Sequence, residues 1–229
     1  MNVEDLKIEK DFNINEKDAL IIVDLQNDFM PSGALPVEKG DQIVDDINKV
    51  AELFKDKKGK VILTQDWHPK NHKSFASQYP DKNPGDLYQT EDGAIGPVLW
   101  ADHCVQDTEG AEFHKNLKKN LGDAVIQKGT NPEIDSYSGF LENDKKTKTE
   151  LTEKLKSLGV ERIFICGLAL DYCCCYTALD GIDLGFEVFF IVDLTKGIDV
   201  PPGNISNCLE NMTNKGIKFT NKDGFINDD

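Results

Sequence analysis

Five short, continuous apolar runs, separated by stretches of helical periodicity, most limit the folds open to this chain. Continuous apolar runs are typical of strands buried on both faces, as in a parallel sheet. The alternation of such runs with helices predicts an α/β fold, namely a three-layer, doubly wound, mostly parallel sheet of five or six strands with helices on both faces. The expected strands are 19–23, 61–63, 124–126, 163–166, 188–192 and, as the sixth, 217–219, and the expected helices are 40–57, 110–120, 147–158, 171–184 and 203–212.

One domain is expected to account for the whole chain of 229 residues, because three-layer α/β domains commonly reach this size. Residues 1–17 precede the first apolar run and are expected to form an N-terminal extension. Residues 69–99 are rich in Pro, Asp, Asn and Gly and show no sustained period, which predicts a long active-site loop. A frayed tail is expected over 221–229.

The charge balance limits the partners of the chain. With 41 acidic and 26 basic residues the net charge is −15, which disfavours nucleic acid and anionic membranes as partners and favours a small-molecule substrate. No apolar run approaches the ~18 residues needed to cross a bilayer, and the first residues lack the features of a signal peptide. Six cysteines without framework spacing indicate reduced thiols. A cytoplasmic location is therefore expected, with access to the nucleus left open.

Three of the four histidines and a nearby aspartate indicate a metal site on loops. Asp66 and His68 are alternate residues after the run 61–63, so an extended backbone can point both the same way, and His103 can close the site from a distant loop. Imidazole and carboxylate ligands suit zinc, iron or manganese better than calcium. Ordinary loop residues are the alternative for any one histidine. Their clustering favours one divalent metal ion, with zinc expected first and iron or manganese as alternatives.

Polar residues that follow four of the expected strands should meet at one edge of the sheet, where parallel sheets bind ligands. These residues are Asp24, Asp66, Lys128 and, in the first turn of the next helix, Cys173. The positive end of a helix dipole lowers the pKa of such a thiol, which indicates a nucleophile. A core thiol or an exposed strand-end residue is the alternative for each one alone. With Asp24 as base and Lys128 as charge partner, however, the three residues meet the criteria for a catalytic constellation.

Together these motifs resemble the nicotinamidase/pyrazinamidase branch of the isochorismatase-like cysteine hydrolases. The similar segments are Ile-Val-Asp-Leu-Gln-Asn-Asp-Phe at 22–29, Asp-Trp-His-Pro at 66–69, Trp-Ala-Asp-His-Cys-Val at 100–105, Lys-Gly at 128–129 and Asp-Tyr-Cys at 171–173, and the resemblance covers about residues 18–195. It implies an isochorismatase-like fold and a metal-dependent amidohydrolase that converts nicotinamide to nicotinate and ammonia in NAD salvage, through a cysteine thioester. Pyrazinamide is a further expected substrate.

The same resemblance implies roles for individual residues. Asp24, Lys128 and Cys173 would form the triad, while Asp66, His68 and His103 would bind the metal. The alternative is a metal-independent isochorismatase-like hydrolase acting on another small amide or carbamoyl substrate, because such relatives share only the Asp, Lys and Cys positions.

Further positions are implied around this centre. Backbone N–H groups of Ala169 and Cys173 would form the oxyanion hole, beside a cis peptide bond between Leu168 and Ala169. His72 is an additional candidate for the metal site or its bound water. The substrate-binding residues would be Phe29, Trp100, Tyr137 and Gln26.

Three residues depart from the family pattern. Leu170 stands where Thr is common, Ala101 where Pro is common and Asp107 where Gly is often seen. None of them removes a reacting group. Leu170 is expected to affect the shape of the turn that feeds the oxyanion hole. It should therefore influence the reaction rate and not the type of reaction. A homo-oligomer is compatible with the sequence.

Overall fold

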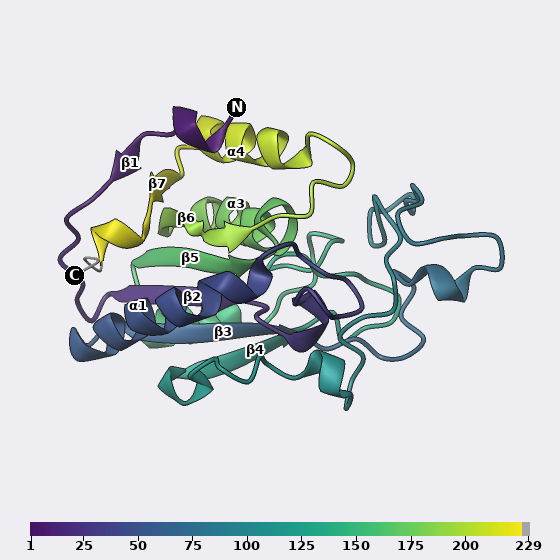
Figure 1. Cartoon of the computed structure of the whole chain (residues 1–229), viewed down its shortest axis with the longest axis horizontal. Coiled ribbons are helices and arrows are strands. Elements are labelled where there is room, and N and C mark those ends of the chain that lie inside the picture. The colour runs from purple at the N-terminus through teal and green to yellow at the C-terminus, as the bar shows by residue number, and fades with distance from the viewer. Residues whose placement is uncertain (226–229) are drawn as a thin grey trace.

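The computed structural model describes residues 1–225 and contains one sheet of seven parallel strands in the order β1-β7-β6-β5-β2-β3-β4 (Figure 1). The strands are β1 (Ile8–Glu9), β2 (Asp18–Val23), β3 (Lys60–Asp66), β4 (Ala124–Lys128), β5 (Arg162–Leu168), β6 (Glu187–Lys196) and β7 (Lys218–Thr220). The α-helices are α1 (Val44–Asp56), α2 (Leu151–Ser157), α3 (Cys175–Asp183) and α4 (Asn204–Asn214), and a π-helical turn, Leu170–Cys174, precedes α3. None of the helices within this range is long and apolar enough to cross a membrane.

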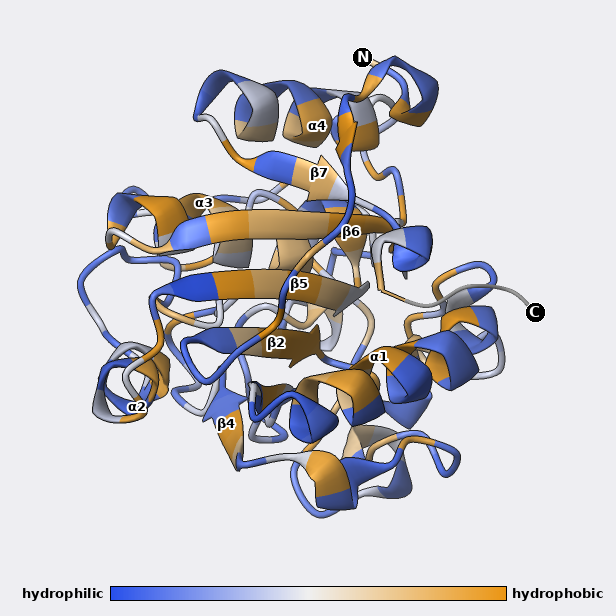
Figure 2. Cartoon of the chain, turned by 90° about the vertical axis from the view of Figure 1, so that its left-hand side faces the viewer, coloured by the Kyte–Doolittle hydropathy of each residue, from blue (hydrophilic) through white to orange (hydrophobic). Residues whose placement is uncertain are grey.

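Helices cover both faces of the sheet, which confirms the predicted three-layer α/β architecture. Strand β2 is buried along its whole length, with Leu20 and Ile22 in the core beneath α1, and Ile21 and Val23 in the core beneath α2, α3 and α4. The central strands are accordingly apolar over most of their length, whereas the helices alternate apolar and polar residues (Figure 2). Burial of both faces is the reason that these strands read as continuous apolar runs.

The sheet has one strand more than the upper expected count of six. The additional strand, β1, lies in the segment expected to be an extension, and it pairs with β7 at the edge of the sheet. A strand of two residues is too short to produce an apolar run. At the other end of the chain, the expected frayed tail is not seen over 221–225, where Phe225 stacks on Phe12 with ring centroids 5.2 Å apart. Residues 226–229 lie outside the described residues.

The helix expected over 110–120 is wrong. This segment contains only short 3₁₀ turns, because part of its backbone hydrogen-bonds to the chain that follows β2. The His114 N–H donates to the Leu25 carbonyl at 2.8 Å, and Asn27 N–H donates to the Glu112 carbonyl at 2.9 Å. The other four expected helices are present with shifted ends.

The sheet order places the reversal of winding between β2 and β5. Strand β2 pairs with β3 on one side and with β5 on the other, all parallel, so the residues after these strands emerge at one edge. The long loop of residues 69–99 lies on this side of the molecule, at the right of Figure 1. Such an edge is where parallel α/β sheets bind their ligands.

Candidate active site

Three polar side chains from three separate strand ends meet at this edge. Asp24 follows β2, Lys128 ends β4, and Cys173 lies in the π-turn after β5. The Lys128 Nζ lies 3.0 Å from Asp24 Oδ2 and 3.4 Å from Cys173 Sγ, and it also donates to the Ser136 carbonyl at 2.7 Å. All three predicted residues are buried. A buried ammonium requires such partners, because an isolated charge is costly to remove from water.

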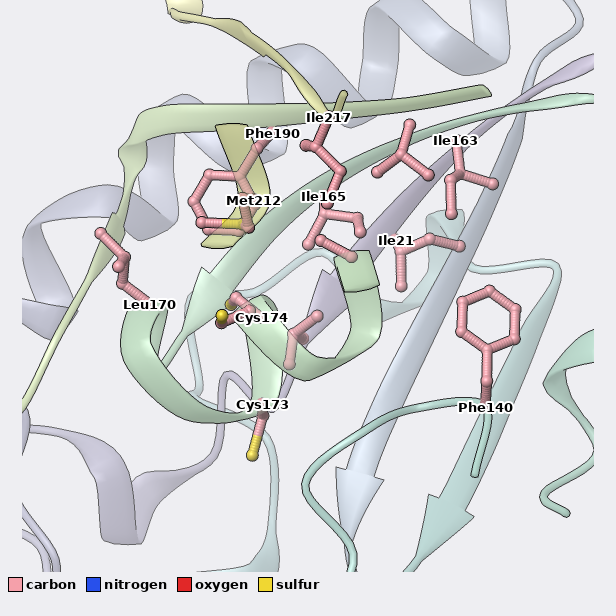
Figure 3. Close-up of a cluster of buried hydrophobic side chains, with 14 of the residues drawn as sticks. Ile21, Phe140, Ile163, Ile165, Leu170, Cys173, Cys174, Phe190, Met212 and Ile217 are labelled. Atoms are coloured by element: carbon pink, nitrogen blue, oxygen red, sulfur yellow. The ribbon is translucent and has the colours of Figure 1, made fainter. Parts of the chain in front are cut away.

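The π-turn separates two neighbouring cysteines into different environments. Both cysteines belong to the buried cluster that contains Ile165 and Phe190, but the Cys173 sulfur points away from those two side chains, whereas the Cys174 side chain lies on their side of the turn (Figure 3). Leu170, which departs from the family pattern, packs its side chain in this core. The peptide bond between Leu168 and Ala169 is cis, as expected.

The expectation of a lowered pKa at Cys173 is wrong for this site. Burial raises the pKa of the Cys173 thiol well above its ordinary value, and the Lys128 ammonium opposes this effect only in part. The helix-dipole argument assumes a thiol that is partly exposed, whereas this one is almost completely enclosed. The thiol therefore needs a base to take its proton.

Asp24 is placed to be that base. Its Oδ1 accepts a hydrogen bond from Thr64 Oγ1 at 2.6 Å. Its Oδ2 faces Lys128 but accepts no well-directed hydrogen bond from any residue that the structure describes. Burial raises the pKa of Asp24, and although Lys128 opposes this, the pKa remains above that of an ordinary aspartate. A raised pKa makes the carboxylate a stronger proton acceptor.

Asp66, His68 and His103 form a second cluster next to the triad, with ligand atoms within 4.8 Å of one another. His68 Nδ1–H donates to the Gly129 carbonyl at 2.9 Å and His103 Nδ1–H donates to the Ala101 carbonyl at 2.7 Å. These bonds leave both Nε2 atoms facing Asp66 Oδ2, at 3.7 and 4.0 Å. Backbone carbonyls orient metal-binding histidines in this way.

The cluster fits a divalent metal ion. Two ligands bound tetrahedrally to zinc are separated by about 3.4 Å, given bonds of roughly 2.1 Å, and the observed separations are only slightly longer. Burial lowers the pKa of His103 to about 4, which leaves the imidazole neutral, as a ligand must be. Burial acts to lower the pKa of His68, but the combined effect of Asp66 and smaller contributions from other neighbours is larger, and the pKa is raised. A metal cation bound here would therefore replace a proton on His68.

Asp66 joins the two clusters. Lys128 Nζ donates to its Oδ1, while its Oδ2 faces the histidines. Gln26, expected to bind substrate, supports this aspartate: its Nε2 donates to the Asp66 carbonyl at 2.7 Å and its Oε1 accepts from Asp66 N–H at 2.8 Å. Both ends of this buried amide are bonded to backbone, since Nε2 also donates to the Ala111 carbonyl at 2.8 Å, and the binding of substrate by Gln26 stays a prediction.

His72 and Asp135 border the metal cluster. The His72 ring lies 4.3 Å from that of His68, while its Nδ1 pairs with Ser74 Oγ at 2.7 Å and its Nε2 with the Ile134 carbonyl at 3.2 Å. Asp135, which the sequence analysis missed, is buried beside both histidines, and its Oδ2 has no hydrogen-bond partner among the described residues. It lies in an irregular loop, where no periodicity marks it.

A narrow cavity opens onto Cys173 and both clusters. Three of the expected substrate-binding aromatics line it, namely Phe29, Trp100 and Tyr137. Trp100 Nε1 donates to Tyr137 Oη at 3.1 Å, which fixes the two rings relative to each other. The cavity wall also includes residues that the sequence analysis did not identify, namely Leu35, Tyr172 and Ile198, together with Ala169 of the expected oxyanion hole.

Comparison with known proteins places this site in a family. The isochorismatase domain matches residues 18–222 of the chain. A nicotinamidase of Escherichia coli (strain K12) is 41% identical over 200 residues, which cover 86% of this chain and 92% of that protein.

Two solved structures are also similar. The nicotinamidase/pyrazinamidase of Acinetobacter baumanii has a TM-score of 0.87 at 39% identity and covers 92% of this chain and 99% of its own. The pyrazinamidase of Pyrococcus horikoshii in complex with zinc has a TM-score of 0.73 at 40% identity. This match covers 90% of the present chain and 99% of the pyrazinamidase chain. The chain belongs to the isochorismatase family.

Proposed function

We propose that this protein is a metal-dependent nicotinamidase, which hydrolyses nicotinamide to nicotinate and ammonia in NAD salvage and accepts pyrazinamide as well. The observation that carries the proposal is the convergence of Asp24, Lys128 and Cys173 with the Asp66, His68 and His103 cluster on one aromatic-walled cavity. The names of the similar proteins support the choice of substrate.

The acylation step begins at Cys173. Asp24 Oδ2 takes the thiol proton, and the sulfur attacks the carboxamide carbon of nicotinamide. The backbone N–H groups of Ala169 and Cys173 stabilise the resulting oxyanion, a contribution of ~3 kcal/mol per donor. The C–N bond then breaks, and Asp24 returns its proton to the departing nitrogen, so that ammonia leaves and a nicotinoyl thioester remains.

Hydrolysis of the thioester uses the same groups. Asp24 accepts a proton from water, and the hydroxide attacks the thioester carbon. The C–S bond then breaks, Asp24 returns its proton to the sulfur to restore the Cys173 thiol, and the acid released ionises in solvent to nicotinate. Lys128 holds Asp24 in place and offsets the negative charge that develops on the sulfur. Phe29, Trp100 and Tyr137 enclose the pyridine ring.

A divalent metal ion, zinc in the first instance, would be held by Asp66, His68 and His103 beside the cavity. When bound, it supplies a Lewis-acidic contact that orients the substrate ring. Asp135 is a further candidate ligand, because one of its carboxylate oxygens lies within 4.8 Å of a ring nitrogen of His68.

The test is ammonia release from nicotinamide by the purified protein, before and after chelation and with zinc, iron or manganese restored. The proposal expects activity that chelation removes and a metal restores. Activity that is indifferent to chelation would indicate a metal-independent hydrolase instead. Cys173→Ala should abolish release, and ammonia release near the wild-type rate from this variant would refute the thioester route.

A further inference from the structure

A buried carboxylate two residues before Cys173 has no part in the chemistry proposed above. Asp171 lies in the π-turn and is completely buried, yet it does not line the cavity. Its Oδ1 accepts from Ile198 N–H at 2.9 Å and its Oδ2 accepts from Asp199 N–H at 2.9 Å. Asn204 Nδ2 donates to Oδ2 and to the Asp171 carbonyl, both at 3.1 Å. The carboxylate therefore binds the backbone of residues 198–199 and the start of α4.

The segment held in this way forms part of the substrate cavity. Residues 197–203 connect β6 to α4, and the Ile198 side chain lies in the cavity wall together with Cys173. The segment passes close over Asp171, because a Cβ on Gly197 would lie 2.9 Å from Asp171 Oδ1. Tyr172, the next residue of the π-turn, also donates from its hydroxyl to the Val200 carbonyl. Two consecutive residues of the nucleophile turn thus hold one wall segment.

We propose that Asp171 is a positioning residue, which fixes the Ile198 wall of the substrate cavity relative to the Cys173 turn. Two adjacent backbone N–H groups require two acceptors, and the two oxygens of a carboxylate supply both. An asparagine of the same shape supplies only one, and its NH₂ group would face a second N–H donor. The identity of the substrate rests on the proposed function, but the positioning itself does not.

The first test is amide hydrogen exchange in substrate-free Asp171→Asn. The Ile198 and Asp199 amides should exchange about tenfold faster than in the wild type, because at least one charge-assisted hydrogen bond is lost. The matched control is Asp180→Asn, another buried aspartate, located on α3 and paired with Lys145 at 3.0 Å. The control should leave both amides unchanged. Unaltered exchange at Ile198 and Asp199 in folded Asp171→Asn would overturn the proposal.

Kinetics provide the second test. Asp171→Asn should raise KM for nicotinamide about tenfold and change kcat by less than about threefold, because the wall contacts substrate but no reacting group. Ile198→Ala, which removes the wall side chain and leaves Asp171 in place, should show the same split. A loss confined to kcat would indicate that Asp171 shapes the Cys173 turn alone, and would refute the proposal.

A milder variant covers the case in which Asp171→Asn does not fold. Asn204→Ala removes one hydrogen bond to Asp171 Oδ2 and should raise exchange at Asp199 more than at Ile198, whose partner is Oδ1. Equal protection of both amides in this variant and in the wild type would count against the proposal. If the wild type releases no ammonia from nicotinamide, the proposed function fails, while the exchange results still decide whether Asp171 positions the segment.

Discussion

Two buried carboxylates, Asp24 and Asp66, flank the same Lys128 ammonium, and their pKa values are shifted in opposite directions. Burial raises the pKa of both, but at Asp24 this effect prevails over Lys128, whereas at Asp66 the combined attraction of Lys128 and two histidines outweighs it and lowers the pKa. One carboxylate oxygen of Asp24 lies within 4.8 Å of the Cys173 sulfur, whereas Oδ2 of Asp66 faces two imidazoles. The comparison shows that the neighbours of each carboxylate other than Lys128 determine its role. Asp24 is placed to accept a proton, and Asp66 is placed to bind a cation.

The largest expected effect is that of Asp24→Asn on turnover. An amide cannot accept the Cys173 proton, so kcat should fall about 10⁴-fold, as when the base of a catalytic triad is removed. The measurement is ammonia release at saturating nicotinamide. Asp180→Asn, a buried carboxylate on α3, is the control and should retain normal turnover. A kcat within tenfold of the wild type in Asp24→Asn would show that another group takes the proton.

Lys128→Met should cause the next largest effect, on stability. It leaves two buried carboxylates without their shared cation, and losing one member of such a buried network lowers the free energy of unfolding by about 3–5 kcal/mol. Chemical denaturation measures this loss. Lys145→Met is the matched control, because Lys145 pairs with Asp180 at 3.0 Å but is half exposed, and it should cost less than about 1 kcal/mol. Equal losses of unfolding free energy in the two variants would contradict the role of Lys128 as the shared cation of Asp24 and Asp66.

Asp66→Asn should impair substrate positioning rather than proton transfer. A neutral amide binds a divalent cation more weakly than a carboxylate, and a misplaced substrate lowers kcat/KM by about 10²-fold. Added zinc should restore part of the loss in this variant and none of it in Asp24→Asn. Normal kcat/KM in Asp66→Asn without added metal would remove Asp66 from the ligand set.

Thr64→Val should have the smallest effect, because it removes a single hydrogen bond to Asp24, worth about 1 kcal/mol. The base acts only when ionised, so kcat/KM is lost as pH falls through the pKa of Asp24. Burial already raises that pKa, and loss of the Thr64 hydroxyl raises it further, so the acidic limb of the pH profile should move to higher pH. If the acidic limb did not move, or moved to lower pH, it would not report the ionisation of Asp24.

The fold and the convergence of Asp24, Lys128 and Cys173 could be predicted because both depend on strands buried on two faces. Such strands are visible as apolar runs, and the polar residues that interrupt them, such as Asp24 and Lys128, necessarily emerge at one edge. The failures have a different origin. The segment 110–120 has helical periodicity, but hydrogen bonds to Leu25 and Asn27 override it. Strand β1 is too short to show any pattern.

Within the site, residues whose role depends on tertiary partners could not be recognised. Gln26 occupies a suitable position in the sequence, but only the structure shows that its amide is bonded to Asp66 and Ala111. Asp135 and Ile198 lie on irregular segments without periodicity. The pKa of Cys173 could not be inferred from its place at a helix start, because burial and neighbouring charges determine its direction.

The most direct test of the division between the two carboxylates is metal analysis of the wild type, Asp24→Asn and Asp66→Asn, each dialysed against zinc and then against metal-free buffer. We expect Asp24→Asn to retain the metal content of the wild type while releasing no ammonia, and Asp66→Asn to lose most of its metal. Loss of metal from both variants, or from neither, would contradict the assignment of one carboxylate to the proton and the other to the cation.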